Sequence, residues 1–336
     1  MRINRKPTLI STQTCLLFTL MATAVILGGL PSKAIAGRGL FLISSDFKTI
    51  KRIDAVDEKF KVLGSPEFSF DGKTIVLDGW EAGQKLDDSR ILIVNADNTG
   101  FKDIGDGCLP SLSPDGKTIA YSRYNNSRGV WLSDNKGKNK RQIATDGWSI
   151  KWLPDGKHVV YTTSDTPFGR FIIYNVDTEE STAVPLIGAV PFWMSYWNFD
   201  VSPDGKQVAF KGSGPNNLKP VMIANIIENT PSLKTLAQSG PMELCWHPDG
   251  KKILFVRKGR NDEHRQLYYY LLRNDDVLEK KWPGQDDSFS ISACVISRDG
   301  KQFAVTAPED TPEKSADEDG GTTDEDPAAG DASNDQ

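Results

Sequence analysis

The sequence predicts an all-β fold, a six-bladed β-propeller with four antiparallel strands in each blade. The first observation is an internal repeat, because Asp-Gly-Lys recurs six times along the 336 residues, at intervals of 40 to 50 residues. The second is that an apolar residue stands three positions before each of these Asp residues, and another stands four positions after it. The third is a further apolar run after each of the first five copies. Units of this length with four short strands are typical of propeller blades.

Each Asp-Gly-Lys copy predicts a tight hairpin between the first two strands of a blade. Pro precedes the Asp in four copies, where its fixed φ suits the first central position of a type I turn. Asp suits the second position, and Gly takes the left-handed position that closes the hairpin with a bulge. Phe70 and Arg298 replace Pro in the first and last copies, which weakens the turn preference there and leaves Asp-Gly in place.

The downstream apolar runs predict the third strand of each blade, with a polar turn and a short fourth strand after it. These runs cover residues 91–94, 130–132, 171–174, 221–226 and 267–272. The sixth hairpin, residues 290–305, has no such run after it, but residues 40–44 and 49–53 have the same layout. We therefore expect the N-terminal strand pair to close the last blade, so that no sheet is left incomplete.

Three parts are expected along the chain: a signal peptide over residues 1–36, the propeller over 37–307 and an acidic disordered tail over 308–336. Arg2, Arg5 and Lys6 precede an apolar run from Cys15 to Leu30, and the small-residue pattern 34–36 resembles a cleavage site. The run is shorter than the roughly 20 residues that cross a bilayer. We expect export with cleavage, no stable membrane span afterwards and a periplasmic or secreted location. An uncleaved membrane anchor is the alternative.

The charge distribution separates the tail from the propeller. Residues 309–336 contain eleven Asp or Glu and one Lys, with no aromatic or large aliphatic side chain, so they cannot bury enough apolar surface to fold. The formal charge of the whole chain is -5, and the region between the two ends is close to neutral. No basic field exists there that would indicate a nucleic-acid partner.

The cysteines do not form a disulfide framework. Cys108, Cys245 and Cys294 remain after the N-terminal segment, an odd number that is widely spaced. We expect them to be small buried apolar side chains. A pairing between Cys245 and Cys294 is the alternative.

The segment Ser113-Pro114-Asp115-Gly116-Lys117, followed by an apolar strand, resembles the repeat of the TolB-type six-bladed β-propeller family. The resemblance covers residues 39 to 306. It implies the propeller fold and an exported protein. The α/β domain that precedes the propeller in TolB is expected to be absent, because only about 20 residues separate Gly37 from the first full blade.

The sequence carries no recognisable enzyme motif. It has no G-x-S-x-G elbow, no H-E-x-x-H, no phosphate-binding loop, no complete G-x-G-x-x-G and no C-x-x-C. With only three His residues, a metal site built from several histidines is not expected. We expect no catalytic residue, no metal and no cofactor.

Binding residues are expected on the loops opposite the Asp-Gly-Lys hairpins, around the central channel. The loop over residues 188–198 places four aromatic residues within six positions, which suits stacking on a sugar ring or an apolar peptide side chain. The alternative is that they plug the channel or pack between blades. The candidate binding residues are Trp80, Arg123, Trp148, Phe192, Trp193, Tyr196, Trp197, Arg257 and His264.

These features predict a non-enzymatic exported binding or scaffold propeller, a monomer whose loop face recognises an envelope protein, a peptide or a glycan. One alternative is a propeller hydrolase or lyase that acts on polysaccharide, with rim carboxylates as acid and base. Convergence of two carboxylates with a cation or a histidine at the channel mouth would favour that alternative. A structural repeat protein with no small ligand is the third interpretation.

Overall fold

The computed structural model describes most of residues 37–315. The residues it leaves undescribed are 1–36, 126, 164–169, 185–193, 215, 217, 228–232, 238–242, 274–275 and 316–336. The side chains of residues 194–197 and 276 are likewise not described. All statements below refer to the described residues.

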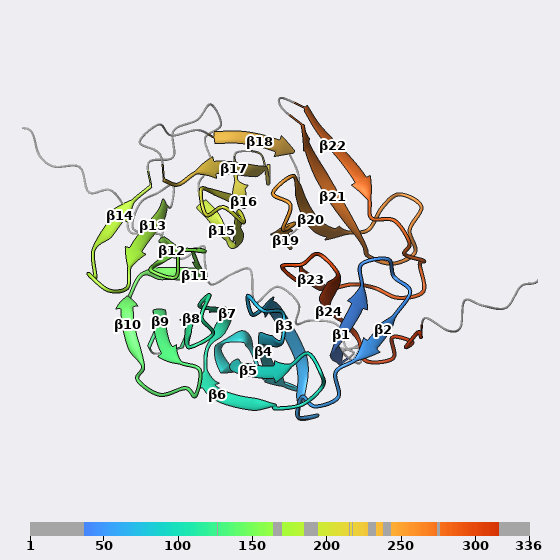
Figure 1. Ribbon diagram of the computed structural model, residues 1–336, viewed down its shortest axis with the longest axis horizontal. Helices are drawn as coiled ribbons and strands as arrows, with labels where there is room; N and C mark the ends of the chain where they lie inside the picture. Colours follow the sequence, from blue (N-terminus) through green and yellow to red (C-terminus); the bar gives the residue numbers. More distant parts are fainter. Residues whose placement is uncertain are drawn as a thin grey trace, which may run out of the picture. The chain divides into compact units, whose positions relative to one another are not determined.

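Six four-stranded antiparallel sheets stand around a central axis as the blades of a propeller, which confirms the predicted fold (Figure 1). In each sheet the first strand is innermost and the fourth is outermost. Blades 1 to 3 consist of β3 (Phe60–Phe68), β4 (Thr74–Glu81), β5 (Arg90–Asn95) and β6 (Lys102–Asp106); β7 (Cys108–Leu112), β8 (Thr118–Arg123), β9 (Gly129–Asp134) and β10 (Arg141–Ala144); and β11 (Gly147–Trp152), β12 (His158–Thr163), β13 (Arg170–Asn175) and β14 (Ser181–Ala183).

Blades 4 and 5 repeat this plan, and blade 6 combines the two ends of the sequence. They consist of β15 (Met194–Val201), β16 (Gln207–Ser213), β17 (Val221–Asn225) and β18 (Leu233–Ala237); β19 (Leu244–Trp246), β20 (Lys252–Arg257), β21 (Gln266–Arg273) and β22 (Asp276–Lys281); and β23 (Ala293–Ile296), β24 (Gln302–Pro308), β1 (Arg38–Ser44) and β2 (Ile50–Arg52). The 3-10 helix η1 (Leu86–Asp88) lies between β4 and β5.

Blade 6 is the seam of the ring, and it forms as the sequence predicts. β1 pairs with β24 from Arg38 opposite Pro308 to Ser44 opposite Gln302. The Glu309 N–H donates to the Gly37 carbonyl oxygen over 3.1 Å, and Lys314 exchanges two backbone hydrogen bonds with Ile50 of the edge strand β2. The first residues of the predicted tail therefore contact blade 6 and cover its edge.

All six hairpins share a hydrogen bond from the backbone N–H of the repeated Lys to the carboxylate of the repeated Asp, and four of them add a bond from a Ser hydroxyl to the same oxygen. In the second blade, Asp115 Oδ1 accepts hydrogen bonds from the Ser113 hydroxyl (2.7 Å) and the Lys117 N–H (3.1 Å). These bonds lower the pKa of Asp115. Gly116 has a φ of 71°, which only glycine adopts without strain, and the five equivalent glycines have φ values between 66° and 73°. We call the side of the ring that carries these hairpins the hairpin face, and the opposite side the loop face.

The hydrophobic core is divided into six clusters, one between each pair of neighbouring blades. Both faces of an inner strand are covered, because side chains alternate along it. In β4, for example, Ile75 and Leu77 pack toward blade 6, whereas Val76 packs toward blade 2. Each blade is therefore held by its two neighbours, and the ring needs all six.

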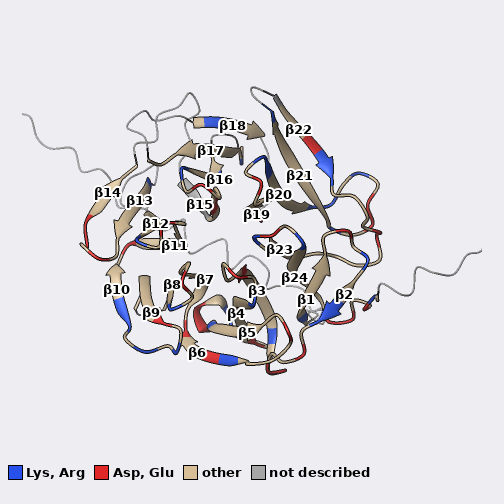
Figure 2. Cartoon of the chain, viewed as in Figure 1, with Lys and Arg blue, Asp and Glu red and all other residues tan. Residues whose placement is uncertain are grey.

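The cysteines agree with the prediction of buried small side chains. Cys108 and Cys245 are buried and Cys294 is partly buried, and all three thiols are free. Burial raises the pKa of the Cys108 and Cys245 thiols. Within the described ranges, the structure holds no helix with the length and apolar character needed to span a bilayer. Basic and acidic residues are interspersed around the ring (Figure 2).

Candidate functional site

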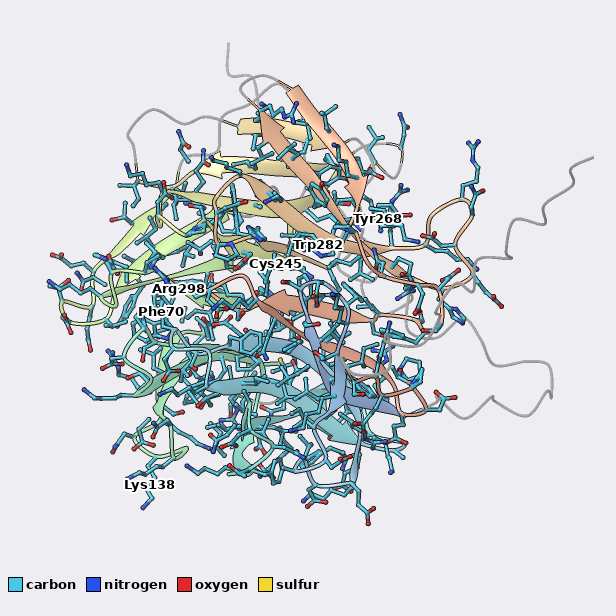
Figure 3. The ribbon with its side chains drawn as sticks, turned by 45° about the vertical axis from the view of Figure 1, so that its right-hand side comes forward. Phe70, Lys138, Cys245, Tyr268, Trp282 and Arg298 are labelled. Atoms are coloured by element: carbon cyan, nitrogen blue, oxygen red, sulfur yellow. The ribbon has the colours of Figure 1, made fainter. Side chains whose placement is uncertain are left out.

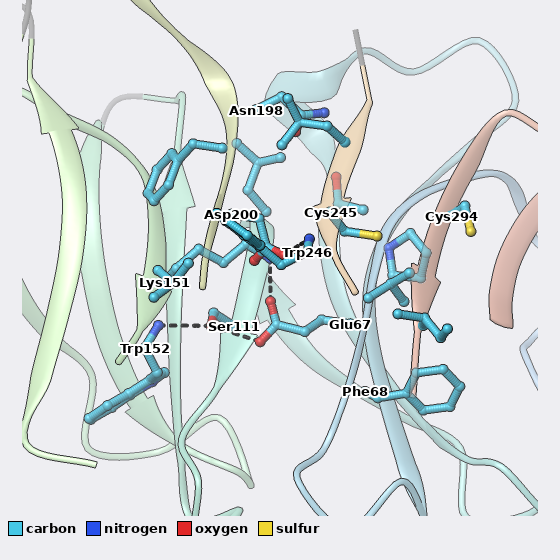
Figure 4. A pocket seen from close by; sticks show the side chains of 18 of the residues that line it. Glu67, Phe68, Ser111, Lys151, Trp152, Asn198, Asp200, Cys245, Trp246 and Cys294 are labelled. Atoms are coloured by element: carbon cyan, nitrogen blue, oxygen red, sulfur yellow. Dashed lines mark hydrogen bonds and ion pairs between the residues drawn. The ribbon is translucent and has the colours of Figure 1, made fainter. Parts of the chain in front are cut away.

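A cavity of about 200 Å³ lies where the innermost strands of all six blades converge (Figure 4). It is lined by residues at equivalent positions of the repeat. We call the residues four positions before the repeated Asp the channel ring: Glu67, Ser111, Lys151, Asp200, Cys245 and Val295. We call those six positions before it the loop-side ring: Ser65, Leu109, Ser149, Asn198, Glu243 and Ala293. Neighbouring residues such as Phe68, Ile150 and Phe199 pack into the clusters between blades.

Three blades are tied together across the channel by the side chains of Glu67, Ser111 and Lys151. Lys151 Nζ forms an ion pair with Glu67 Oε2. Glu67 Oε1 accepts hydrogen bonds from the Ser111 hydroxyl (2.8 Å) and the Leu112 N–H (3.1 Å). Ser111 Oγ in turn accepts from the Trp152 N–H (3.1 Å). Burial alone would lower the pKa of Lys151, but the Glu67 and Asp200 carboxylates outweigh it and raise that pKa.

Asp200 brings a second carboxylate to the channel ring from blade 4. Its Oδ2 accepts a hydrogen bond from the Trp246 N–H of blade 5 (2.7 Å). Burial raises the pKa of Asp200 to about 6; the Lys151 ammonium opposes this shift and the Glu67 carboxylate adds to it. Two carboxylates and one lysine therefore converge in the channel, and one of the carboxylates titrates near neutral pH.

A third carboxylate, Glu243, lies in the loop-side ring. The Asn198 amide donates a hydrogen bond to Glu243 Oε2 over 2.6 Å. Burial raises the pKa of Glu243, and the bond from Asn198 opposes that shift. The channel thus holds three carboxylates against one ammonium, and that ammonium is paired with Glu67.

The hairpin side of the cavity is lined by the residues that directly precede the repeated Asp. Three of these are Pro154, Pro203 and Pro248, and the other two are Phe70 and Arg298. The guanidinium carbon of Arg298 lies 4.2 Å from the centroid of the Phe70 ring. The two positions at which the repeat departs from proline are therefore neighbours at one mouth of the channel.

The inner strands of blades 1 to 3 carry β-bulges in the loop-side ring. Ser65, Leu109 and Ser149 have φ values of 46°, 52° and 38°, an uncommon conformation for residues other than glycine. The bulge of β7 turns the Leu109 N–H toward Asp78, whose Oδ2 accepts it over 2.8 Å. Asp78 is only 2% exposed, and burial raises its pKa. The bulge of β7 thus turns a backbone donor toward the buried carboxylate of Asp78 in the neighbouring blade.

A second hollow, of about 640 Å³, lies on the outer part of blade 1. Five carboxylates and two basic side chains line it, together with Phe60, Gln84 and Asn125. Arg90 binds two of the carboxylates, Asp103 and Asp106, and Arg123 also pairs with Asp106 over 3.3 Å. Much of the charge in this hollow is therefore matched within the protein.

The loop-face residues predicted from the sequence whose side chains are described, Trp80, Arg123, Trp148, Arg257 and His264, lie on several different blades. Trp148 packs against the Tyr124 ring, with 4.8 Å between centroids, and the Arg128 guanidinium lies 3.9 Å above its ring. Arg123 stacks over Trp131 and pairs with Asp106.

The remaining described candidates lie on separate blades. Trp80 is half-buried on β4 of blade 1. Arg257 of blade 5 pairs with Glu279 and stacks over Tyr268. The His264 N–H donates to Asp287 over 2.8 Å. None of these lines the central cavity.

The aromatic residues of the 188–198 loop cannot be placed. Phe192 and Trp193 lie outside the described residues, and Tyr196 and Trp197 belong to β15 with side chains that are not described. Their proposed role in binding stays a prediction.

Sequence reasoning missed Glu67, Lys151, Asp200 and Glu243. A signal for them does exist, because the channel ring and the loop-side ring place charged or polar residues inside otherwise apolar inner strands. Aligning the six copies on their Asp residues would have shown this. No group of three or more His, Cys, Asp or Glu residues that could hold a metal ion occurs in the described part of the chain.

Comparison with known proteins supports the fold and leaves the activity open. No protein-family model matches the sequence, and no curated protein does so. Among solved structures, the chain is similar to TolB from Acinetobacter baumannii, with a TM-score of 0.55 and 17% identity over 83% of this chain and 65% of that one. The match therefore spans slightly less than two thirds of that TolB chain.

A putative TolB from Agrobacterium tumefaciens is similar over 81% of this chain and 98% of its own, with a TM-score of 0.57 and 16% identity. Hydrazine synthase of Kuenenia stuttgartiensis has a TM-score of 0.51 at 15% identity, over 74% of this chain and 75% of that one. The chain is thus a TolB-like six-bladed propeller in fold. Identity this low extends to the fold alone.

Proposed function

We propose that the protein is an exported, non-enzymatic binding propeller that takes part of its ligand into the central channel. The observation that carries this is the excess of acceptor groups in the cavity. Asp200 and Glu243 each receive one hydrogen bond from another strand, and the single lysine among them is paired with Glu67. Burying a carboxylate is costly unless it is paired with a cation. A cationic group of a ligand would therefore stabilise Asp200 and Glu243.

The volume of the cavity limits the size of the ligand that it can hold. At about 200 Å³ it is smaller than the roughly 300–1,000 Å³ of drug-sized pockets, so it suits one extended side chain or a small linear molecule. A run of several sugar rings does not fit the channel itself. A larger partner would contact the loop face, where Trp148 and the 188–198 loop are the predicted contacts.

A thermal-shift screen of small polar molecules tests the channel directly. We expect molecules that raise the Tm of the protein to lose their effect in Val295→Phe, which fills the channel ring, and to keep it in Trp148→Ala on the loop face. Asp200→Asn serves as a second channel variant if Val295→Phe fails to fold. Hits that depend on Trp148 and not on the channel variants would overturn the proposal.

Export is the other part of the proposal. The basic start, apolar run and cleavage pattern of residues 1–36 support it. N-terminal sequencing of protein recovered outside the cytoplasm should give a chain that begins at Gly37. A chain that still begins at Met1 would contradict cleavage.

A polysaccharide hydrolase or lyase is the second candidate, and one observation favours it. Glu67 and Asp200 converge with Lys151, and the pKa of Asp200 is raised to about 6, within the range of a general base. Both oxygens of Glu67 are already engaged, which weighs against it as an acid. Release of reducing ends or unsaturated products from polysaccharides, abolished in Asp200→Asn, would establish this activity in place of simple binding.

A further inference from the structure

The inference begins with two side chains that break the repeat. Four of the six hairpins have Pro before the Asp, and the exceptions are Phe70 in the first copy and Arg298 in the last. These copies are far apart in the sequence, but blades 6 and 1 are neighbours in the ring, so the two exceptions meet (Figure 3). Both line the hairpin-side mouth of the cavity.

The Arg298 guanidinium is held in place and its donors are unused. It stacks on Phe70 at 4.2 Å and is exposed to solvent. Among the described residues it makes no ion pair, whereas Arg90, Arg123 and Arg257 each pair with a carboxylate. A planar guanidinium fixed on an aromatic ring presents its N–H groups edge-on, in the geometry that binds a carboxylate.

The charged groups are distributed unevenly along the channel. Arg298 is basic at the mouth, whereas deeper in the channel the carboxylates of Glu67, Asp200 and Glu243 outnumber the one ammonium, that of Lys151, which is paired with Glu67. The mouth residues come three positions after the channel-ring residues of the same blade, so the chain between them spans at most about 10 Å. A complementary ligand has an anion at one end and a cation at the other, separated by roughly this distance.

We propose that the channel binds a linear molecule with a carboxylate at one end and an ammonium at the other. The carboxylate pairs with Arg298 at the mouth, and the ammonium lies toward Asp200 and Glu243. This proposal rests on the proposed function, in which the channel is the ligand site. It adds the chemical class of the ligand and its direction.

Calorimetric titration with three probes of equal length tests the proposal: 8-aminooctanoate, octanoate and octylamine. For the unaltered protein we expect 8-aminooctanoate to bind about ten-fold more tightly than either probe that lacks one charged end. Shorter ω-amino acids, such as 4-aminobutanoate, should bind more weakly because they cannot reach both ends.

The decisive variant is Arg298→Pro, which installs the residue that four other hairpins carry. The hairpin is expected to survive, because the Gly300 N–H bonds to the Ser297 carbonyl (2.9 Å) as Gly116 does to Ser113 in a proline-containing copy (2.8 Å). Arg298→Pro should weaken 8-aminooctanoate and octanoate about ten-fold and leave octylamine unchanged. Asp200→Asn should weaken 8-aminooctanoate and octylamine and leave octanoate unchanged.

Arg128→Ala is the matched control. Arg128 is also an exposed arginine stacked on an aromatic ring, but it lies on the loop face against Trp148. It should not affect any probe. If Val295→Phe abolishes binding and Arg298→Pro does not alter it, the channel is a ligand site and the carboxylate subsite is wrong. If none of the probes binds to the unaltered protein, or if Val295→Phe has no effect on their binding, the channel proposal itself fails for this ligand class.

Discussion

The two halves of the channel use the same repeat position in opposite ways. In blades 1 to 3 the channel ring is Glu67, Ser111 and Lys151, and these side chains bind one another across three strands. In blades 4 to 6 the ring is Asp200, Cys245 and Val295. Among the described residues Asp200 forms no ion pair; its carboxylate accepts a hydrogen bond from the Trp246 N–H and is acted on by the Lys151 charge. The first half therefore pairs its charged groups with one another, whereas the second half holds a carboxylate without an ion pair.

The largest effect is expected in the first half, from Lys151→Met. This change leaves the Glu67 carboxylate, 17% exposed, without its cation, and it should lower the free energy of unfolding by about 3 kcal/mol. Urea unfolding measures it. Adding Glu67→Gln should recover most of the loss, because a neutral amide does not need the ammonium. If Lys151→Met alone is as stable as the parent, the ion pair does not stabilise the first half of the channel, and the two halves do not differ in this respect.

A smaller, pH-dependent effect is expected in the second half. The carboxyl of Asp200 has a pKa of about 4 in an unfolded chain and about 6 in the folded one. The folded state therefore binds the proton more tightly, so the contribution of Asp200 to stability falls as the pH rises from 4 to 6 and is level above that. Asp200→Asn should lack this loss and gain about 2 to 3 kcal/mol relative to the parent between pH 4 and 7. If the free energies of unfolding of the parent and Asp200→Asn change with pH in parallel, this effect of Asp200 is ruled out.

The smallest effects compare two uncharged members of the channel ring. Ser111→Ala removes a donor to Glu67 and an acceptor for the Trp152 N–H, and it should cost about 1 kcal/mol. Val295→Thr, at the equivalent position of the other half, should change stability by less than about 0.5 kcal/mol. If Ser111→Ala and Val295→Thr lower the free energy of unfolding equally in chemical denaturation, the two halves of the channel do not differ as described.

The ring and its closing blade were predictable because they follow directly from the sequence repeat. Six copies of one hairpin and a missing strand pair at one end are enough to place residues 40–53 beside residues 290–305. The channel was harder to predict, because Glu67, Lys151 and Asp200 are far apart in sequence and meet only when the blades are arranged around an axis. No local sequence pattern predicts the β-bulges at Ser65, Leu109 and Ser149.

The loop-face candidates show the limit of reading residue types. The planar guanidinium of an arginine suits an anionic ligand, yet Arg123 and Arg257 each have a carboxylate partner within the protein. Arg298, which the sequence shows as a substitute for proline in a turn, stacks on Phe70 at the mouth of the channel and forms no ion pair among the described residues. Whether a charged side chain is available is decided by its neighbours in space, and hydrophobic periodicity carries no information about them.

The meeting of Gly37 and Glu309 in blade 6 has a consequence for how the gene can be rearranged. Because the two backbones already touch, a short linker could join them, and new ends could be opened in the exposed loop between β4 and β5. Such a circular permutant would contain every strand pairing of the six sheets and would lose only the bridge between Lys314 and Ile50. The fold would then not depend on the order in which the blades are synthesised.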